Sequence, residues 1–427
     1  MIEKLYEIFL KSNGVSIDTR TIKKGQLFFA LKGEKFDGHH FVKQAIEKGA
    51  IAAVIDNPNF KLNAKTIIVD NTLKTLQKLA NYHRKKLNIK ILAITGTNGK
   101  TTTKELTARV LMQKFRTYFT KENLNNHIGV PINLLSISKN TQFAVIEMGA
   151  SYPDDIKLLC NIADPDFGII TNIYPAHIQG FGDFKTLIKT KAQLYDHLKN
   201  KNGLIFYNTD NKILVELIND YNNIFPYGLS NGTVKGKIIA QNPYLSVEIY
   251  LPKKSIQIHT HLIGNYNLEN IIAAAAVGEY FKIDPTAIKN AIENYIPKNN
   301  RSQLENTGKN WIIRDFYNAN PTSMLLALEN FLTIKAPKKA VILGDMLELG
   351  NYEKEGHYQI LKKLENTNVK VFLVGKIFSQ LNKNPNFKTY TSTNELNQYL
   401  LEHPIENHLI LLKASRGIHL ENVLKHL

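Results

Sequence analysis

A glycine-containing turn followed by a lysine and a threonine is the clearest chemical signal in the sequence. The buried-strand pattern IKILAITG, residues 89–96, leads into ITGTNGKTTTKEL, residues 94–106. Backbone N–H groups of such a turn, and the N-terminus of the helix after it, bind phosphate oxygens. Lys100 would contact the terminal phosphates, and the Thr101 hydroxyl would bind magnesium. The spacing is the short G-x-x-G-K-T, because position 94 is Ile rather than Gly, and the pattern predicts ATP binding.

A glutamate lies at the end of a later buried-strand pattern. FAVIEM, residues 143–148, places Glu147 at the carboxyl end of a strand, and the carboxyl ends of neighbouring parallel strands lie on one edge of a sheet. A lone glutamate in this position is more often a capping or surface residue. Beside a phosphate-binding turn it is placed to hold magnesium, a cation that prefers oxygen ligands.

These residues need a parallel sheet to position them, and the whole chain has that pattern. Apolar strand patterns alternate with helical stretches, which predicts βαβ units. The strand patterns are QLFFAL (26–31), AAVID (52–56), KTIIVD (65–70), FGIITNI (167–173), WIIRDFY (311–317), AVILGDM (340–346), VKVFLVG (369–375) and HLILLKAS (408–415). A break falls at PKNNRSQ, residues 297–303, where Pro and Asn interrupt the pattern.

The predicted fold class is α/β with three domains. A central P-loop-type domain with a doubly wound sheet, residues 89–297, is flanked by a mixed α/β domain, 1–88, and by a Rossmann-like domain, 298–427. In open α/β sheets of this kind, active sites lie at the carboxyl ends of the strands.

The composition excludes several classes of protein. The single cysteine, Cys160, excludes a disulfide framework and a thiolate-rich metal site, and it is compatible with the cytoplasm. No apolar run approaches the roughly 20 residues of a membrane span, and the start, MIEKLYEIFLKSNG, lacks the pattern of a signal peptide. The 54 basic and 37 acidic residues give a net charge of +17. Because the lysines are spread along the chain, we expect a solvated surface and anionic small substrates rather than nucleic acid.

Several motifs in a fixed order make the chain resemble the Mur ligase family. Besides the phosphate-binding turn and IEMGA (146–150), they are NLNNHIGVPINLL (123–135), AHIQGFGDFKTLIKTKAQLY (176–195), GNYNLENIIAAAA (264–276), RSQ (301–303), DFYNANPTSM (315–324), GDMLELG (344–350) and KASRG (413–417). Each motif alone is of moderate specificity. Their common order over nearly the whole chain carries the resemblance.

The first part of the chain is similar to the uridine-nucleotide domain of the family. The segment SIDTRTIKKGQLFFALKGEKFDGHHF, residues 16–41, carries this similarity. The usual Asp-Ser-Arg of the family is Asp18-Thr19-Arg20 here, a departure that keeps the hydroxyl group. The resemblance therefore implies that residues 1–88 bind a UDP-linked substrate.

The resemblance also implies how the nucleotide is bound. Tyr266 replaces a histidine that is more common in the family, but Asn267 and Asn270, which the family uses around the adenine, are intact. The implied nucleotide-binding residues are Gly96, Thr97, Asn98, Gly99, Lys100, Thr101, Thr102, Asn267, Asn270, Arg301 and Asp315. In the family, Arg301 and Asp315 approach ATP when the last domain closes, which implies a hinge near residues 297–300.

The implied activity is an ATP-dependent amide ligation in peptidoglycan precursor synthesis. D-Alanyl-D-alanine is joined to UDP-N-acetylmuramoyl-tripeptide through an acyl phosphate, giving the UDP-muramoyl-pentapeptide, ADP and phosphate, with residues 298–427 closing over ATP and binding the dipeptide. The implied substrate-binding residues are Asp18, Thr19, Arg20, Asn125, Asn126, Asn318 and Asn320. ATP and Mg²⁺ are the expected cofactors, and a cytoplasmic monomer is expected. The third residue of the tripeptide, diaminopimelate or lysine, stays open, and so does the base for the incoming amine.

Lys191 and His177 have roles only through the resemblance. By its own pattern Lys191, like Lys185 and Lys189, belongs to a solvated helix face. In the family, the lysine followed by A-Q-L-Y is carbamylated and binds a second magnesium through its new oxygens. His177, in the string A-H-x-x-G-F-G, reads as part of the same metal site. The implied catalytic residues are Lys100, Glu147, His177, Lys191 and Arg301, and the implied metal ligands are Thr101, Glu147, His177 and carbamylated Lys191.

Three alternatives stay open at this point. The ligase that adds the third residue carries Asp-Asn-Pro-Arg when it adds diaminopimelate, whereas this chain has YNANP at 317–321. Folylpolyglutamate synthetase shares the fold but would lack the uridine-nucleotide segment. A non-catalytic nucleotide-binding regulator is disfavoured because Lys100, Glu147, His177 and Lys191 are all retained.

Overall fold

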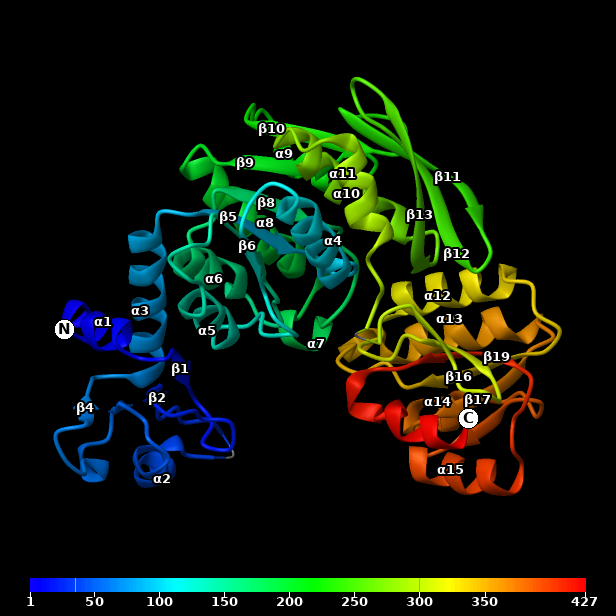
Figure 1. Ribbon diagram of the computed structural model, residues 1–427. Coiled ribbons are helices and arrows are strands. Elements are labelled where there is room, and N and C mark those ends of the chain that lie inside the picture. The colour runs from blue at the N-terminus through cyan, green and yellow to red at the C-terminus, as the bar shows by residue number, and fades with distance from the viewer. Residues whose placement is uncertain (35, 299) are drawn as a thin grey trace.

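The computed structural model describes residues 1–34, 36–298 and 300–427 and contains three β-sheets (Figure 1). The sheets have four, nine and six strands and follow one another along the chain. The α/β class with three sheets agrees with the sequence prediction. The sheets fall within 1–88, 89–297 and 298–427, and these domain limits stay a prediction. Residue 299 of the expected hinge and residue 35 of the 16–41 segment lie outside the described residues.

The first sheet is small and parallel, with the strand order β1-β2-β3-β4. Its elements are α1 (Ile2–Leu10), β1 (Val15–Ser16), β2 (Leu27–Phe29), α2 (Val42–Glu47), β3 (Ala52–Ile55), β4 (Thr66–Ile68) and α3 (Thr72–Leu87). The Asn71 side chain caps α3 by accepting a hydrogen bond from the Lys74 N–H. The helix ends at Asn88, which has the left-handed conformation that terminates helices.

Helix α3 joins the first domain to the second through both apolar and polar contacts. It packs on α5 (Gly129–Leu135) and α6 (Asp155–Ala163), and one hydrophobic cluster contains Leu76 and Leu79 of α3 together with Val130 of α5. The Arg84 guanidinium is 2.9 Å from the Asp166 carboxylate and donates to the Ala163 carbonyl. The first two domains therefore share one hydrophobic cluster, beside the clusters that each has of its own.

The second sheet carries the phosphate-binding turn. Its strand order is β13-β12-β11-β10-β9-β8-β5-β7-β6, and the strands from β11 to β6 are parallel to their neighbours. Beyond α5 and α6, its elements are β5 (Lys90–Thr95), α4 (Lys100–Met112), β6 (Thr117–Phe119), β7 (Phe143–Glu147), β8 (Phe167–Ile170), α7 (Ile178–Phe181), α8 (Phe184–Asn200), β9 (Leu204–Asn208), α9 (Lys212–Ile218), β10 (Ile224–Gly228), β11 (Val234–Gln241), β12 (Tyr244–Tyr250), β13 (Ser255–Ile263), α10 (Asn267–Tyr280) and α11 (Pro285–Glu293). In the parallel pairing of β5 with β7, Ile94 lies opposite Glu147, so both strands end at the same edge. β7 is buried along its whole length, which explains its continuous apolar pattern.

Strands β11, β12 and β13 form an antiparallel extension that the sequence analysis did not single out. β12 and β13 alternate buried and more exposed residues, as strands with one covered face do. Their covered face packs on α10 and α11. The sheet is therefore doubly wound only up to β10, and a meander completes it.

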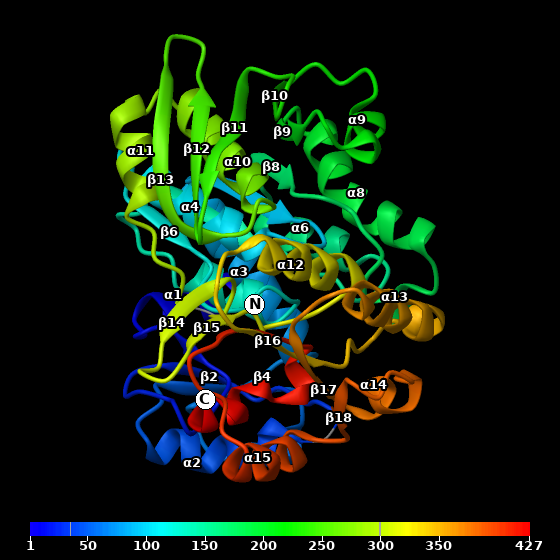
Figure 2. The same cartoon turned by 90° about the vertical axis from the view of Figure 1, so that its right-hand side faces the viewer.

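The third sheet has the order β14-β15-β19-β16-β17-β18 and is parallel except for β14. Its elements are β14 (Gln303–Asn306), β15 (Trp311–Arg314), α12 (Pro321–Thr333), β16 (Lys339–Gly344), α13 (Glu353–Glu365), β17 (Lys370–Val374), α14 (Lys376–Leu381), β18 (Lys388–Tyr390), α15 (Thr393–Glu402) and β19 (Leu409–Lys413). A capping box of Asn320 and Ser323, with Pro321 in the first turn, begins α12. Figure 2 shows α12 between the β11–β13 meander and the third sheet, and Gln241 of β11 donates to the Thr333 hydroxyl.

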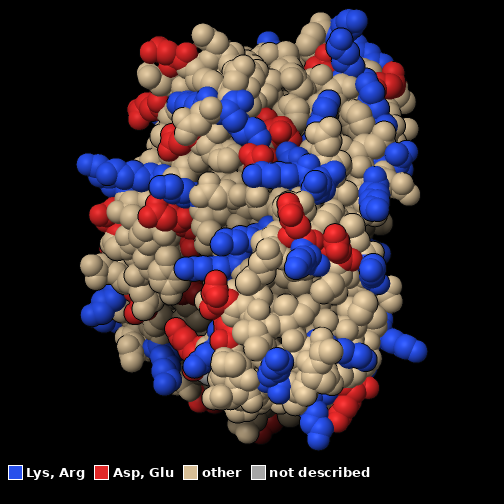
Figure 3. All heavy atoms as spheres, turned by 90° about the vertical axis from the view of Figure 1, so that its left-hand side faces the viewer, with Lys and Arg blue, Asp and Glu red and all other residues tan. Residues whose placement is uncertain are grey.

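The basic side chains do not gather into one patch on the face of the molecule that carries the first domain. Figure 3 shows Lys and Arg side chains scattered over this face, with Asp and Glu among them and uncharged surface between. Within the described ranges, no helix is both long and apolar enough to cross a bilayer.

The shared core of the first two domains gives a stability prediction. Leu76 is fully buried in that cluster, so Leu76→Ala is expected to lower the free energy of unfolding by about 2–5 kcal/mol. Urea unfolding measures the change. Leu62, which is 48% exposed, provides the matched control, and Leu62→Ala is expected to change stability by less than about 0.5 kcal/mol. Equal effects of the two substitutions would contradict the shared core.

Candidate active site

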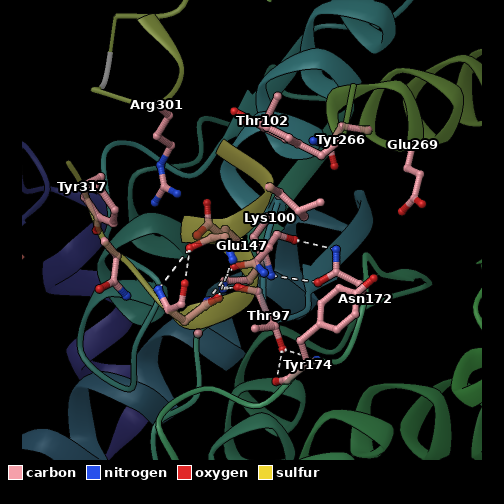
Figure 4. Close-up of a pocket in the computed structure, with 18 of the residues that line it drawn as sticks. Thr97, Lys100, Thr102, Glu147, Asn172, Tyr174, Tyr266, Glu269, Arg301 and Tyr317 are labelled. Atoms are coloured by element: carbon pink, nitrogen blue, oxygen red, sulfur yellow. Dashed lines mark hydrogen bonds between the residues drawn. The ribbon is translucent and has the colours of Figure 1, made fainter. Parts of the chain in front are cut away.

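A cavity of about 740 Å³ lies where the second and third domains meet (Figure 4). The carboxyl ends of β5, β7 and β8 and the start of α10 supply one wall, and the third domain supplies the other. The cavity is lined by these predicted site residues: Thr97, Asn98, Gly99, Lys100, Thr102, Asn125, Asn126, Glu147, His177, Asn267, Asn270, Arg301, Asp315, Asn318 and Asn320. The fold thus brings residues as far apart in the sequence as Thr97 and Asn320 into one cavity.

The phosphate-binding turn connects β5 directly to α4. Gly96 and Gly99 both have positive φ angles, +141° and +79°, which glycine adopts most readily. A Cβ atom on Gly99 would lie 2.4 Å from Asn270 Oδ1, so the turn also needs glycine for space. The Lys100 amine donates to the carbonyls of Gly96 (2.9 Å) and Thr97 (3.0 Å). Burial lowers the pKa of Lys100 to about 8, while Glu147 opposes this shift.

Glu147 is buried at the end of β7, and both of its carboxylate oxygens have partners. The Thr101 hydroxyl donates to Oε2 (3.0 Å), and Asn125 Nδ2 donates to Oε1 (2.9 Å). Within the described ranges, no cluster of three or more His, Cys, Asp or Glu side chains forms a metal site. One carboxylate beside a hydroxyl and a phosphate-binding turn nevertheless fits magnesium, which commonly takes few protein ligands and completes its shell with water and phosphate.

Lys191 is buried beneath the turn rather than exposed in the cavity. Its amine donates to the Gly96 carbonyl (3.0 Å), and it does not line the cavity. Burial, with the nearby Lys100 charge as a further cause, lowers the pKa of Lys191 well below its ordinary value. Lys185 and Lys189 of the same helix are exposed. The environment therefore distinguishes Lys191 from both neighbouring lysines and favours a neutral amine.

His177 links the two walls of the cavity. It has a left-handed backbone conformation at the start of α7, and its Nδ1 is hydrogen-bonded to the Glu348 carboxylate of the third domain. Glu348 itself has φ +65°. Hydrogen bonding to His177 lowers the pKa of Glu348. The sequence analysis did not assign Glu348, although it lies in the quoted motif GDMLELG.

The asparagines at the start of α10 form a buried network beside the turn. Asn270 Nδ2 donates to Asn267 Oδ1 (2.9 Å), and the Thr103 hydroxyl donates to Asn270 Oδ1 (3.0 Å). Tyr266, at the place of the more common histidine, is hydrogen-bonded to the Ser302 hydroxyl (2.7 Å). Tyr266 thus connects the second domain with the start of the third.

The third domain contributes a cationic and an anionic group to the opposite wall. The Arg301 guanidinium lies 3.9 Å from the centre of the Tyr317 ring, and Asp315 forms an ion pair with Lys413 (2.6 Å). Asn320 Nδ2 donates to Asn98 Oδ1 (2.8 Å), directly on the phosphate-binding turn. In the view of Figure 4, Arg301 and Tyr317 lie on one side of Lys100 and Glu147, and Tyr174 and Glu269 lie on the other.

Asp18, Thr19 and Arg20 lie apart from this cavity. The Arg20 guanidinium donates to both oxygens of the Asp18 carboxylate, and its side chain is 87% exposed. Thr19 is buried, and its carbonyl accepts a hydrogen bond from Lys48. A role of these residues toward a uridine nucleotide stays a prediction.

The cavity also contains residues that the sequence analysis did not assign. Among them are Tyr174, whose carbonyl accepts a hydrogen bond from the Thr97 hydroxyl, and Glu269, whose pKa is raised by burial. Tyr317 and Lys413 lie inside the quoted motifs DFYNANPTSM and KASRG, so position within a motif was an available signal for both. Glu269 likewise lies inside the quoted motif GNYNLENIIAAAA, whereas Tyr174 lies between two quoted segments and carries no such signal.

Protein-family models match almost the whole chain. The model described as the Mur ligase family, catalytic domain, matches residues 11–90, the Mur ligase middle domain matches 94–278, and the Mur ligase, glutamate ligase domain, matches 300–416. The UDP-N-acetylmuramoyl-tripeptide–D-alanyl-D-alanine ligase of Bacillus subtilis (strain 168) is 35% identical over 97% of this chain and 93% of its own length. The chain belongs to the Mur ligase family.

Solved structures of Mur ligases have the same architecture. Crystal structure I of MurF from Acinetobacter baumannii matches with a TM-score of 0.89 at 27% identity, over 100% of this chain and 98% of that one. The MurF ligase of Thermotoga maritima in complex with ADP matches with a TM-score of 0.86 at 25% identity, over 98% and 97% of the two chains. The three-domain α/β fold predicted from the sequence is thereby confirmed.

The geometry of the turn predicts the effect of a methyl group at Gly99. Gly99→Ala adds a Cβ to a left-handed residue and forces it against Asn270, so the affinity for ADP is expected to fall about 10-fold or more. Isothermal titration calorimetry measures the affinity. Gly308 has a similar φ of +86° but nothing within 4 Å of its Cβ position, so Gly308→Ala should leave the affinity within about twofold. Unchanged binding in Gly99→Ala would show that the turn does not hold the nucleotide.

Proposed function

We propose that this Mur ligase joins D-alanyl-D-alanine to UDP-N-acetylmuramoyl-tripeptide at the expense of ATP, in peptidoglycan precursor synthesis. The observation that carries the proposal is the cavity that combines Lys100 and Glu147 with Arg301 and Asp315 from the facing domain. The 35% identical relative has this activity in its name. We expect the enzyme to act in the cytoplasm as a monomer.

The reaction proceeds in two balanced steps. The terminal carboxylate of the tripeptide attacks the γ-phosphorus of ATP, which forms an acyl phosphate and releases ADP. The amine of the dipeptide, having lost a proton, then attacks the acyl carbon, the amide bond forms and phosphate leaves. Both steps bring together anions, so catalysis depends on positioning and on cationic groups. Lys100 lines one wall of the cavity, and Arg301 and Lys413 line the other. The tripeptide carboxylate is proposed to enter between Lys100 and Arg301.

Magnesium would be held by Glu147 and the Thr101 hydroxyl. When bound, it would neutralise charge on the phosphate oxygens. The hydrogen bonds from Thr101 and Asn125 fix the Glu147 carboxylate at the end of β7, beside the turn. These contacts orient the carboxylate before any ligand binds.

Lys191 is proposed to carry a carbamate that contributes to a second magnesium site with His177. A neutral amine adds to carbon dioxide, an N–C bond forms and one proton is released. The burial that lowers the pKa of Lys191 favours the neutral amine that this step requires. Lys185 and Lys189 do not have this environment, because they are exposed.

The third domain is proposed to close over ATP and to exclude water from the acyl phosphate. Its direct links to the second domain include the hydrogen bonds Asn320–Asn98 and His177–Glu348. Both are polar and lie at the cavity, so they are suited to re-form when the domains move. The adenine is proposed to lie beside Asn267 and Asn270.

The substrate requirement is the direct test of the proposal. ADP release is expected only when UDP-N-acetylmuramoyl-tripeptide and D-alanyl-D-alanine are both present, with the pentapeptide identified by mass spectrometry. Tripeptides ending in diaminopimelate and in lysine are compared in parallel. Comparable turnover of the UDP-linked dipeptide with a diamino acid would assign the chain to the ligase that adds the third residue. No turnover with any pair would favour a nucleotide-binding regulator.

Substitutions of three lysines on α8 test the proposed carbamate. Lys191→Ala is expected to lower the rate about 100- to 1,000-fold, as the loss of a group that stabilises transition-state charge does. Steady-state ADP release measures the rate, and thermal unfolding verifies that the variant is folded. Lys185→Ala and Lys189→Ala, at exposed positions, should change the rate less than about threefold.

Two further measurements separate the carbamate from a plain cationic role. Millimolar formate or acetate should partly restore Lys191→Ala, because a small carboxylate fits the position of the carbamate. Lys191→Arg keeps a positive charge but cannot form the carbamate, so it should stay inactive. Full activity of Lys191→Arg would identify an ordinary structural lysine.

A further inference from the structure

A second cavity, of about 720 Å³, lies beside the first and shares Arg301 and Tyr317 with it. Its other residues come from α4, from the loop before α5, from the segment after α11 and from the segment after β19. Thr101, whose hydroxyl donates to Glu147, lines this second cavity. The second cavity therefore reaches the reaction centre from the side on which Arg301 and Tyr317 lie in Figure 4.

Three arginines line this cavity without an acidic partner. Arg20, Arg84 and Arg314 each pair with a carboxylate. Arg109, Arg301 and Arg416, in contrast, form no ion pair with any residue that the structure describes. The Nε atoms of Arg109 and Arg301 are buried and have no hydrogen-bond partner among those residues. Buried donors without partners are costly unless a ligand satisfies them.

Aromatic rings hold these guanidinium groups in place. Arg301 and Arg416 lie 3.9 and 5.9 Å from the centre of the Tyr317 ring, and Arg109 lies 5.1 Å from that of Tyr295. Stacking on a ring orients a guanidinium while leaving its N–H groups free. Such groups bind a carboxylate with two parallel hydrogen bonds.

The cavity is not uniformly cationic, because Glu105, Glu122 and Glu421 also line it. Glu105 is paired with the buried Lys104 (3.0 Å). A lining of both signs suits a zwitterion better than a phosphate or a nucleic acid. An unprotected dipeptide is such a ligand, with an ammonium group at one end and a carboxylate at the other.

The dimensions also fit a dipeptide. Two extended residues span about 7 Å, whereas Thr101 and Arg109 are about 12 Å apart along α4 at 1.5 Å per residue. Both residues line the cavity, so the length of the Arg109 side chain is available to span the difference. A dipeptide whose amine lies near Thr101 thus presents its carboxylate to the arginines.

We propose that the second cavity binds the incoming dipeptide and that Arg416 and Arg109 hold its terminal carboxylate. This inference rests on the proposed function, because it assigns one of the two amide-forming substrates to a place. Arg301, shared by both cavities, then lies between the nucleotide and the dipeptide. Arg416 comes from the third domain, so domain closure brings the carboxylate-binding group to a dipeptide already seated on the second domain.

Kinetics with a dipeptide that lacks the negative charge test the proposal. Arg416→Ala and Arg109→Ala are each expected to raise the KM for D-alanyl-D-alanine about 10- to 100-fold, with little change in the KM for ATP or for the UDP-linked tripeptide. The KM of Arg416→Lys for the dipeptide should lie between those of wild type and Arg416→Ala, because lysine keeps the charge but loses the paired hydrogen bonds. With wild type, D-alanyl-D-alanine amide should give a kcat/KM that is lower than that of the free dipeptide by a similar factor.

The decisive comparison combines the two changes. In Arg416→Ala, replacing the dipeptide by its amide should cause almost no further loss of kcat/KM, because the guanidinium proposed to bind the carboxylate is absent. Arg116, just before β6, forms no ion pair with the residues that the structure describes and lines neither cavity. It is the matched control, and Arg116→Ala should leave every KM within about twofold.

Two results would overturn the assignment. One is equal use of the amide and the free dipeptide by wild type. The other is a raised KM for the UDP-linked tripeptide, rather than for the dipeptide, in Arg416→Ala. Because both comparisons need turnover by wild type, a wild-type enzyme that is inactive with these substrates would instead overturn the proposed function.

Discussion

Two lysine amines share one carbonyl oxygen at the centre of this molecule, and much of the site follows from that arrangement. Lys100 and Lys191 lie 2.9 and 3.0 Å from the oxygen of Gly96. Two buried ammonium groups this close repel each other, so both are poised to give up a proton or to gain an anion. A triphosphate bound as proposed would relieve this repulsion at Lys100, and the proposed carbamate would relieve it at Lys191. Gly96 has a φ of +141°, and the Thr97 N–H that follows its carbonyl donates to the Asn172 carbonyl, which fixes the backbone on both sides of this oxygen.

The three domains are attached to one another in unequal ways. The first and second share one hydrophobic cluster, and α3 adds the Arg84–Asp166 ion pair to it. The apolar clusters of the third domain take in one residue of the second, Ile263 of β13, and side-chain hydrogen bonds such as Asn320–Asn98 also join the two domains. Breaking a few such hydrogen bonds costs far less than separating a core. The third domain is thus the part whose position we expect substrates to control.

The parts of the structure that could be predicted are those whose signal is local. Buried parallel strands have continuous apolar runs, and the turn at 96–100 follows one directly, so the placement of Lys100 and Glu147 at one sheet edge was predictable.

Lys191 also carried a local signal, because it lies on the same helical stripe as Leu187, Leu194 and Leu198, all buried. Lys185 and Lys189 lie off that stripe. Helical spacing therefore separates the three lysines without any resemblance to a family. The cationic wall of the second cavity had no such signal, since Arg109 and Arg416 are brought together only by the packing of two domains. The His177–Glu348 contact is hidden for the same reason.

Helix α3 also limits how this protein is assembled from parts. By chain order it closes the first domain, yet its apolar face and Gln77, Asn81 and His83 contact α5, α6 and the loops beside them. A cut at residue 88 would leave the second domain without the helix that covers it, and would leave the first with an exposed apolar stripe. Exchange of the first domain between relatives would have to include the matching surfaces of α5 and α6. Substitutions on the contact face of α3 would thus need compensating substitutions on α5 and α6, and the segment that has to be exchanged is larger than the first sheet.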